Sequence, residues 1–158
     1  MKRVIFLFIG VFSLLSFASC EEEDSPLRFS VENIDDSENV KLEYYSVDPH
    51  CIPKAYYITS YSRASELTIR CTNANALFIN GNTATHKFVC TEGYWWAEIA
   101  NSNTLIFHFE EIEDNPDEEI APLYGGVEIC SQTKKGVVKT YITVKRINKP
   151  TTDPFYFY

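Results

Sequence analysis

Basic charge and histidine are scarce in this sequence. Among 158 residues, 14 Lys and Arg stand against 22 Asp and Glu, with three His, and the net charge is −8. This balance disfavours nucleic acid and anionic lipid surfaces as partners, because both are negatively charged. Motifs for a phosphate-binding loop, a zinc-protease helix and a nucleophile elbow are also missing. We therefore expect neither enzymatic activity nor a cofactor.

A long apolar run is missing as well. The longest run, 4–15, has about a dozen residues, whereas a membrane-spanning helix needs roughly 20. The run follows Lys2–Arg3 and ends in the small residues Ala18–Ser19, directly before Cys20. A charged start, an apolar centre and a small-residue exit are the parts of a secretory signal peptide. We expect residues 1–19 to form a signal helix that is cleaved on export, which would change the net charge from −8 to −10 by removing two basic residues.

The segment Phe17–Cys20 resembles a bacterial lipobox. The resemblance implies that Cys20 becomes the first residue of the mature chain and carries lipid, such as palmitate, which anchors the protein in a membrane. An ordinary cysteine beyond a simple cleavage site is the alternative.

Four acidic residues follow the lipobox, and they resemble the export signal of Bacteroidetes lipoproteins that face outward from the outer membrane. The resemblance implies an outer-membrane, cell-surface location. A solvated acidic linker is the alternative, and an acidic tether would stay extended in either case. We expect residues 20–27 to be a lipidated tether, with an export signal formed by Glu21, Glu22, Glu23 and Asp24.

The sequence holds five cysteines, and assigning Cys20 to lipid leaves an even set. An exported protein can oxidise such a set to disulfides, here with three possible connectivities. Strand phase predicts that Cys71 and Cys90 both point into the core, so the simplest prediction pairs them. A surface bond between Cys51 and Cys130 would follow, and unpaired small hydrophobic residues are the alternative.

The mature chain shows no sustained helical spacing of apolar residues. Short β-branched and aromatic runs alternate with Asn, Gly, Pro and Asp clusters, which is typical of strands. In the segment Thr104–Glu110, for example, alternate residues are apolar. Many short strands favour a single antiparallel, immunoglobulin-like β-sandwich, because a parallel sheet needs long crossovers. The predicted strands lie near Phe29–Ile34, Val40–Ser46, Ala55–Ser60, Glu66–Cys71, Ala76–Asn80, Lys87–Thr91, Trp95–Ala100, Thr104–Glu110, Gly126–Ser131 and Val137–Ile147.

The sandwich domain is predicted to span 28–148 and to be followed by an aromatic tail at 149–158. We expect this tail to dock on the sandwich, and the alternatives are that it adds an edge strand or presents a strand to a partner. One long acidic insertion, 110–122, lies between two well-patterned strands and is predicted to be an exposed loop. Its carboxylates at 110–119 could supply oxygen ligands for Ca²⁺. Their order does not match an EF-hand loop, so we predict no metal site and leave calcium binding as an open alternative.

Three aromatic doublets lie on predicted strands: Tyr44–Tyr45, Tyr56–Tyr57 and Trp95–Trp96. Adjacent residues on a strand point to opposite faces, so about one ring of each doublet should meet solvent. Exposed rings can stack on the C–H faces of sugars while polar neighbours bind the hydroxyls. Packing under a loop, at a sheet edge or in a protein interface is the alternative. The predicted ligand-binding residues are Trp95, Trp96, Tyr44 and Tyr57.

The segment 66–147 resembles the Bacteroidetes-associated carbohydrate-binding domains. The likeness rests on the strand Tyr94–Ile99, on Asn103–Leu105 at the start of the next strand, and on the two closing strands. It implies a β-sandwich that binds glycan, although the acidic loop 110–119 replaces the Asn, Ser and Arg stretch usual in that family. We expect a non-enzymatic surface lipoprotein that binds glycan, and our second hypothesis is an accessory subunit of an outer-membrane uptake or cell-surface assembly.

Overall fold

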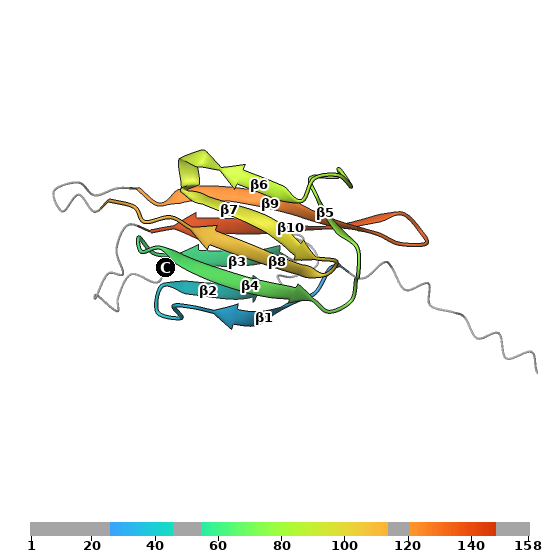
Figure 1. Cartoon of the computed structure of the whole chain (residues 1–158), viewed down its shortest axis with the longest axis horizontal. Helices are drawn as coiled ribbons and strands as arrows, with labels where there is room; N and C mark the ends of the chain where they lie inside the picture. The colour runs from blue at the N-terminus through green and yellow to red at the C-terminus, as the bar shows by residue number, and fades with distance from the viewer. Residues whose placement is uncertain (1–25, 46–54, 114–120, 148–158) are drawn as a thin grey trace, which may run out of the picture.

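A computed structural model of the chain describes residues 26–45, 55–113 and 121–147. Strands dominate these ranges, and the predicted all-β fold is confirmed (Figure 1). A single-turn 3₁₀ helix, η1 (Thr91–Gly93), precedes one of the strands. The strands are β1 (Phe29–Ile34), β2 (Val40–Tyr45), β3 (Ala55–Ser60), β4 (Ser65–Cys71), β5 (Leu77–Ile79), β6 (Lys87–Cys90), β7 (Trp95–Asn101), β8 (Thr104–Phe109), β9 (Leu123–Gln132) and β10 (Val137–Arg146).

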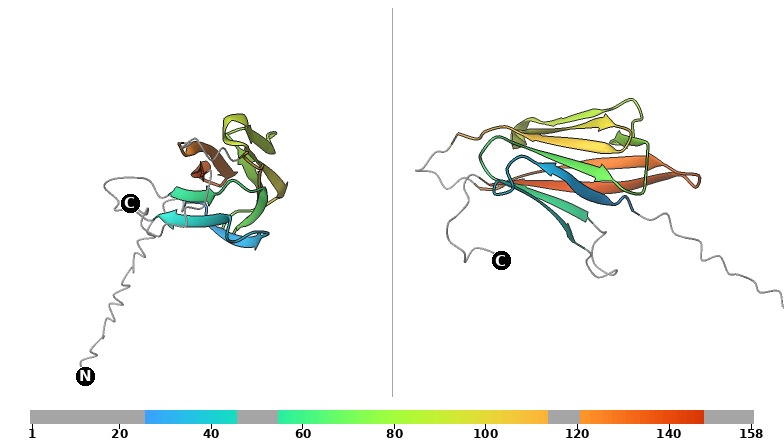
Figure 2. Two further views of the ribbon diagram at one scale, coloured as in Figure 1. Left: turned by 90° about the vertical axis from the view of Figure 1, so that its left-hand side faces the viewer. Right: turned by 60° about the horizontal axis from the view of Figure 1, so that its bottom comes forward.

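The strands form two five-stranded sheets that pack face to face as a sandwich (Figure 2). The first sheet, called sheet A, has the order β1-β4-β8-β7-β6, and the second, sheet B, has the order β2-β3-β10-β9-β5. Neighbouring strands are antiparallel with one exception, the parallel pair β3 and β10. A parallel pair needs a long connection, and most of sheet A lies between β3 and β10 in the chain.

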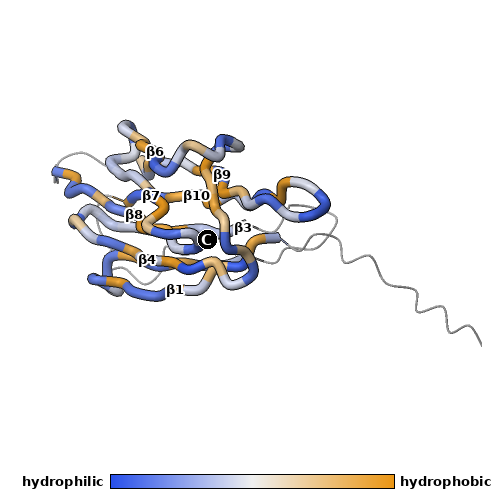
Figure 3. Tube along the Cα trace, turned by 45° about the vertical axis from the view of Figure 1, so that its right-hand side comes forward, coloured by the Kyte–Doolittle hydropathy of each residue, from blue (hydrophilic) through white to orange (hydrophobic). Residues whose placement is uncertain are grey.

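The core lies between the sheets and follows the predicted alternation. On β8, Leu105, Phe107 and Phe109 point inward and are buried, whereas Ile106 and His108 point to the outer face and are only partly buried. Figure 3 shows hydrophobic segments along β7 and β9 and hydrophilic segments in the strand connections. Each strand therefore has one face in the core and one face directed away from it.

Trp95 occupies one end of the core, where two glycines let the backbone approach its indole. A Cβ atom on Gly93 would lie 2.5 Å from the indole Nε1, and one on Gly125 would lie 3.2 Å from Cζ2. The rings of Phe88 and Phe107 pack beside it, with centroid separations of 5.5 and 6.0 Å. Larger residues at the two glycine positions would therefore overlap or crowd the indole.

Arg146 closes the same end of the sandwich from within. Its side chain is 1% exposed and donates hydrogen bonds to the carbonyl oxygens of Tyr94 at 2.6 Å, Glu110 at 2.6 Å and Tyr61 at 3.1 Å. The guanidinium also lies 5.3 Å from the ring centroid of Phe109. Burial lowers the pKa of Arg146 to about 10, against the opposing attraction of Glu110. One buried cation thus joins three connections between strands.

The predicted disulfides are not formed by the cysteines that the structure describes. Cys71, Cys90 and Cys130 are free thiols. Cys71 and Cys90 both lie in sheet A, but β8 and β7 separate their strands, which puts them roughly 14 Å apart at the usual strand spacing. A disulfide needs Cα atoms within about 7 Å, so the Cys71–Cys90 prediction is wrong.

Cys130 is also placed differently from its prediction. It lies on the outer face of sheet B, as its phase with Glu128 requires, yet it is fully buried because Phe78 and the connection near Gly81 cover it. Burial raises the pKa of the Cys130 thiol most strongly. A hydrogen bond from the Gly81 backbone lowers the pKa, and the hydrogen bond that the thiol donates to the Glu128 carboxylate raises it. Cys51, its proposed partner, lies outside the described residues.

Several other predictions also fall outside the described ranges. They include the signal at 1–19, Cys20 with its acidic neighbours Glu21–Asp24, most of the acidic loop and the tail 149–158. Within the described ranges, no helix has the length and apolar character needed to cross a membrane.

Candidate functional site

The structure separates the predicted exposed rings from the buried ones. In two doublets one ring is buried and the other is partly exposed: Trp95 and Tyr56 are 1% and 5% exposed, and Trp96 and Tyr57 lie on the opposite strand faces. Tyr44 is 45% exposed. The side chain of Tyr45 lies outside the described residues, so the expected alternation is confirmed for the other two doublets.

The four predicted ligand-binding residues do not form one site. Trp95 is in the core, where no ligand can reach it, and Trp96 is on the outer face of sheet A. Tyr57 is on the outer face of sheet B. Tyr44 shares the inner phase of β2 and packs on Tyr56 with a centroid separation of 4.8 Å.

On the outer face of sheet A, Trp96 is flanked on both sides. The imidazole of His108, on β8, stacks on its indole at 4.7 Å with an interplanar angle of 12°. The Nζ of Lys87, on β6, lies 5.2 Å from the ring centroid. Because β7 runs between β8 and β6, these two groups reach Trp96 from opposite sides. A sugar that stacked on Trp96 would have to displace one of them.

His108 is itself held between two carboxylates. Its Nδ1 lies 3.2 Å from Glu66 and its Nε2 lies 3.3 Å from Glu98. A further ion pair, Arg70 with Glu32 at 3.2 Å, lies on the β1 side of the same sheet. The charged side chains of these ion pairs on the outer face of sheet A are therefore paired with one another.

The outer face of sheet B carries the most exposed aromatic rings of the described residues. Tyr124 is 65% exposed and Tyr141 is 52% exposed, on the neighbouring strands β9 and β10. Tyr57 lies on the next strand, β3, opposite Thr143 of β10, which in turn is opposite Gly126 of β9. We call Tyr57, Tyr124 and Tyr141 the tyrosine face.

Gly126 gives the tyrosine face its shape. A Cβ atom at this position would overlap the Tyr141 phenol ring, so the ring lies directly over the glycine. Tyr124 is two residues from Gly126 along β9, a spacing of roughly 7 Å. The rings of Tyr124 and Tyr141 are therefore neighbours on an open surface.

Polar groups border the tyrosine face. Lys145 lies opposite Tyr124, with its Nζ 5.9 Å from the ring centroid. Lys139 and Glu128 form an ion pair at 3.1 Å beside Tyr141, and the hydrogen bond and charge of Glu128 raise the pKa of Lys139. Hydroxyl, ammonium and carboxylate groups thus lie within the same surface as the rings.

Sequence reasoning did not include Tyr141 or Tyr124 in the site, although Tyr141 lies on the predicted strand Val137–Ile147. The predicted strand begins at Gly126, because Gly125 and Gly126 weaken the strand pattern. The structure begins β9 at Leu123, so Tyr124 joins the sheet. Tyr124 could have been identified from the pairing of its segment with Thr143 and Lys145 of the closing strand. That pairing depends on the register of the hairpin, which the sequence does not show directly.

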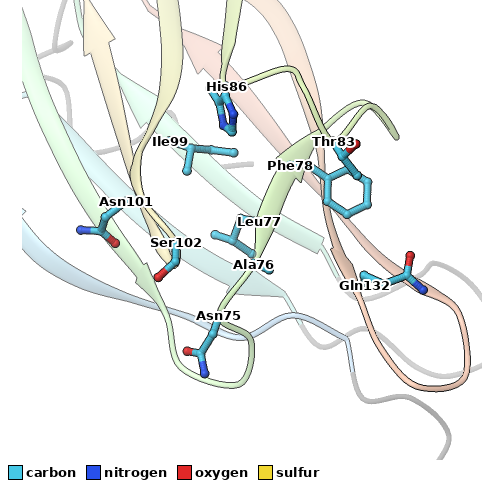
Figure 4. Close-up of a pocket in the computed structure, with 10 residues that line it drawn as sticks. All are labelled: Asn75, Ala76, Leu77, Phe78, Thr83, His86, Ile99, Asn101, Ser102 and Gln132. Atoms are coloured by element: carbon cyan, nitrogen blue, oxygen red, sulfur yellow. The ribbon is translucent and has the colours of Figure 1, made fainter.

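A cleft of about 490 Å³ opens at the end of the sandwich that lies away from Arg146 (Figure 4). Its floor is apolar and contains Leu77 and Ile99, with Phe78 at one side. Polar side chains surround this floor, and sequence reasoning did not identify any of them. They are Asn75, Thr83, His86, Asn101, Ser102 and Gln132.

Comparisons with known proteins assign no family and no function to this chain. No protein-family model matches the chain, and no curated protein matches it. An NMR structure of a protein from Bacteroides thetaiotaomicron is similar, with 12% sequence identity and a TM-score of 0.40 over 79% of this chain and 91% of that one.

Proposed function

We propose that this chain is a non-enzymatic lipoprotein of the outer membrane, anchored through Cys20, that binds glycan at the cell surface through the tyrosine face. The observation that carries the glycan proposal is the pair Tyr124 and Tyr141, two strongly exposed rings on adjacent strands of one sheet. The lipid anchor and the cell-surface location are proposed from the sequence of the first 24 residues.

The tyrosine face has the chemistry that sugar binding requires. Phenol rings offer flat apolar surfaces for the C–H faces of sugar rings, and their hydroxyls can hydrogen-bond at the same time. Thr143, Lys145 and Glu128 supply donors and acceptors within the same surface. The spacing of roughly 7 Å between Tyr124 and Gly126, over which Tyr141 lies, suits adjacent residues of a glycan chain.

The tyrosine face suits this role better than Trp96 does. Stacking on a sugar requires a free ring face, and Trp96 lies between His108 and Lys87. Tyr124 contacts a single cation at 5.9 Å and remains 65% exposed. Sugar binding at Trp96 would have to replace existing contacts, whereas binding at Tyr124 would cover exposed ring surface.

A glycan array probed with the full chain tests the binding proposal. We expect at least one class of glycan to bind, and Tyr124→Ala and Tyr141→Ala each to weaken that binding about tenfold, the loss expected for one stacking ring. Trp96→Ala is the matched control on the other sheet and should leave the affinity within about twofold. Equal losses from all three variants, or no bound glycan at all, would contradict the proposal.

The lipid anchor and the cell-surface location are tested separately on intact cells. We expect mass spectrometry of the mature N-terminus to find acyl chains on Cys20, and external protease to remove the domain from whole cells. A Cys20→Ala variant should lose the lipid and leave the membrane fraction. A lipidated domain that external protease cannot reach would move the protein to the inner side of the outer membrane.

The exposed tyrosines also favour a second function, that of an accessory subunit in an outer-membrane or cell-surface assembly. Tyrosine is enriched at protein interfaces. For this function we expect a stable partner to co-purify after mild detergent extraction, and Tyr141→Ala to release it. Co-purification together with silence on the glycan array would make this the preferred function.

A further inference from the structure

The cleft at the open end is built from four separate segments of the chain. Leu77 of β5 forms its floor, and its backbone N–H bonds to the Ser102 carbonyl in the β7–β8 connection at 3.1 Å. The backbone N–H of Ile99 bonds to the His86 carbonyl at 2.8 Å, which fixes another wall. Gln132, at the end of β9, completes the border. The backbone around the cleft is therefore held in place by hydrogen bonds between segments.

The polar side chains around the cleft have unused hydrogen-bonding groups. Within the described part of the chain, the Asn75 amide, the Ser102 hydroxyl and the His86 ring make no hydrogen bond to protein. Asn101 uses its Oδ1 to accept from the Asn103 N–H at 3.2 Å, which leaves its Nδ2 group for another acceptor. Figure 4 shows these side chains arranged around Leu77. Donors and acceptors therefore surround an apolar floor.

We propose that this cleft is a second binding site, which takes a single neutral sugar residue. The volume of about 490 Å³ lies within the range of small-molecule sites, about 300–1,000 Å³. Leu77 and Ile99 would contact the C–H face of the sugar, and the amide, hydroxyl and imidazole groups would bind its hydroxyls. None of the residues that line the cleft is Asp, Glu, Lys or Arg. An acidic sugar would therefore find no cation to balance its carboxylate.

The cleft is distinct from the tyrosine face. Gln132 lies eight residues from Tyr124 along β9, a separation of roughly 27 Å, and four residues from Glu128, the partner of Tyr141, a separation of roughly 13 Å. A single sugar residue cannot contact both sites. Binding at the cleft therefore does not depend on the proposed function of the tyrosine face, and each can fail without the other.

Photolabelling of the full chain tests the proposal. The probes are diazirine derivatives of glucose, N-acetylglucosamine and glucuronate. Trypsin cleavage after Arg70 and Lys87 yields the peptide 71–87, which contains six of the lining residues and none of the tyrosine face. We expect both neutral probes to label this peptide and the glucuronate probe to label it roughly tenfold less.

Two variants in which phenylalanine replaces an exposed alanine separate specific from non-specific labelling. Ala76 is exposed and lines the cleft, so Ala76→Phe should fill it and reduce the labelling of peptide 71–87 roughly tenfold. Ala84 is equally exposed but does not line the cleft, so Ala84→Phe should retain the labelling. Tyr124→Ala should also retain it, since that change affects the other site.

Three results would overturn the proposal. They are equal labelling by all three probes, labelling that persists in Ala76→Phe, and no labelling of peptide 71–87 by either neutral probe. Labelling confined to the peptides that carry Tyr57 or Tyr141 would refute the cleft site while supporting the tyrosine face. Loss of array binding in Tyr124→Ala with cleft labelling intact would support both sites.

Discussion

The two ends of the sandwich use their polar groups in opposite ways. β7 begins at Trp95, next to the end that Arg146 closes, and finishes at Asn101, in the cleft. At the closed end, three backbone carbonyls that face inward are satisfied by one buried guanidinium. At the open end, the Asn75 amide, the Ser102 hydroxyl and the His86 ring make no hydrogen bond within the described residues.

This difference indicates which polar groups serve the fold and which remain available for binding. A buried carbonyl without a donor costs about 1–3 kcal/mol, so the three hydrogen bonds that Arg146 donates stabilise the native state. Exposed groups that water can satisfy cost little, and a ligand can replace the water. We therefore expect substitutions at the closed end to change stability, and substitutions at the open end to change binding alone.

The largest effect should come from Arg146→Met. Methionine fills part of the space but leaves three carbonyls without a donor, so we expect the free energy of unfolding to fall by at least about 3 kcal/mol in urea titrations. Lys139→Met removes an exposed cation of the same strand and should lower the stability far less than Arg146→Met does, because exposed ion pairs contribute little. Equal costs for the two variants would show that the buried guanidinium does not hold the closed end together.

Gly93→Ala should have the next largest effect. The added Cβ atom would lie 2.5 Å from the indole Nε1 of Trp95, which is fixed in the core, and overpacking of this kind costs about 1–3 kcal/mol. Gly126→Ala is the comparison, since its Cβ atom would meet the flexible Tyr141 ring instead. We expect Gly126→Ala to cost less stability in the same urea titrations but to weaken glycan binding, because the ring has to leave its place on the tyrosine face.

The buried thiol of Cys130, near the open end, gives a pH-dependent effect. Burial raises its pKa in the folded state, so the unfolded chain loses this proton first as the pH rises above about 9. The stabilising contribution is complete below that pH and is lost above it, by at most about 1.4 kcal/mol per pH unit. The stability difference between the wild type and Cys130→Ala should therefore shrink as the pH rises from 8 to about 10. A difference that stays constant in urea titrations across this range would show that the thiol is not protected from ionisation.

The sequence correctly predicted features that depend on the geometry of a single strand. Strand positions and the shared face of Leu105 and Phe107 follow from alternation along one strand, and the structure confirms this. Alternation also predicted one exposed ring in the Trp95–Trp96 doublet but not which one, and Trp95, named as a binding residue, is in the core. The disulfide prediction failed because strand phase says that Cys71 and Cys90 point inward but does not say how many strands lie between them. Sheet order is a long-range property.

Other features depended on segments that are distant in sequence. Arg146 is in phase with the buried Val144, so alternation is consistent with its inward direction, but sequence reasoning did not identify it. Its acceptors Tyr61 and Tyr94 are more than 50 residues away. The cleft likewise combines 75–102 with Gln132. No short motif marks such a site, because its parts meet only after the sheets have packed.

The smallest stability effect, and the most direct test of the comparison between the ends, should come from Asn75→Ala and Ser102→Ala. Both side chains are exposed and make no hydrogen bond within the described residues, so each change should alter the free energy of unfolding by no more than about 0.5 kcal/mol. The same variants should nevertheless reduce the labelling of peptide 71–87 by neutral sugar probes. A stability loss above about 1 kcal/mol would mean that these groups support the fold as Arg146 does. The proposed difference between the two ends, polar groups that stabilise the fold at one and polar groups that bind ligand at the other, would then be wrong.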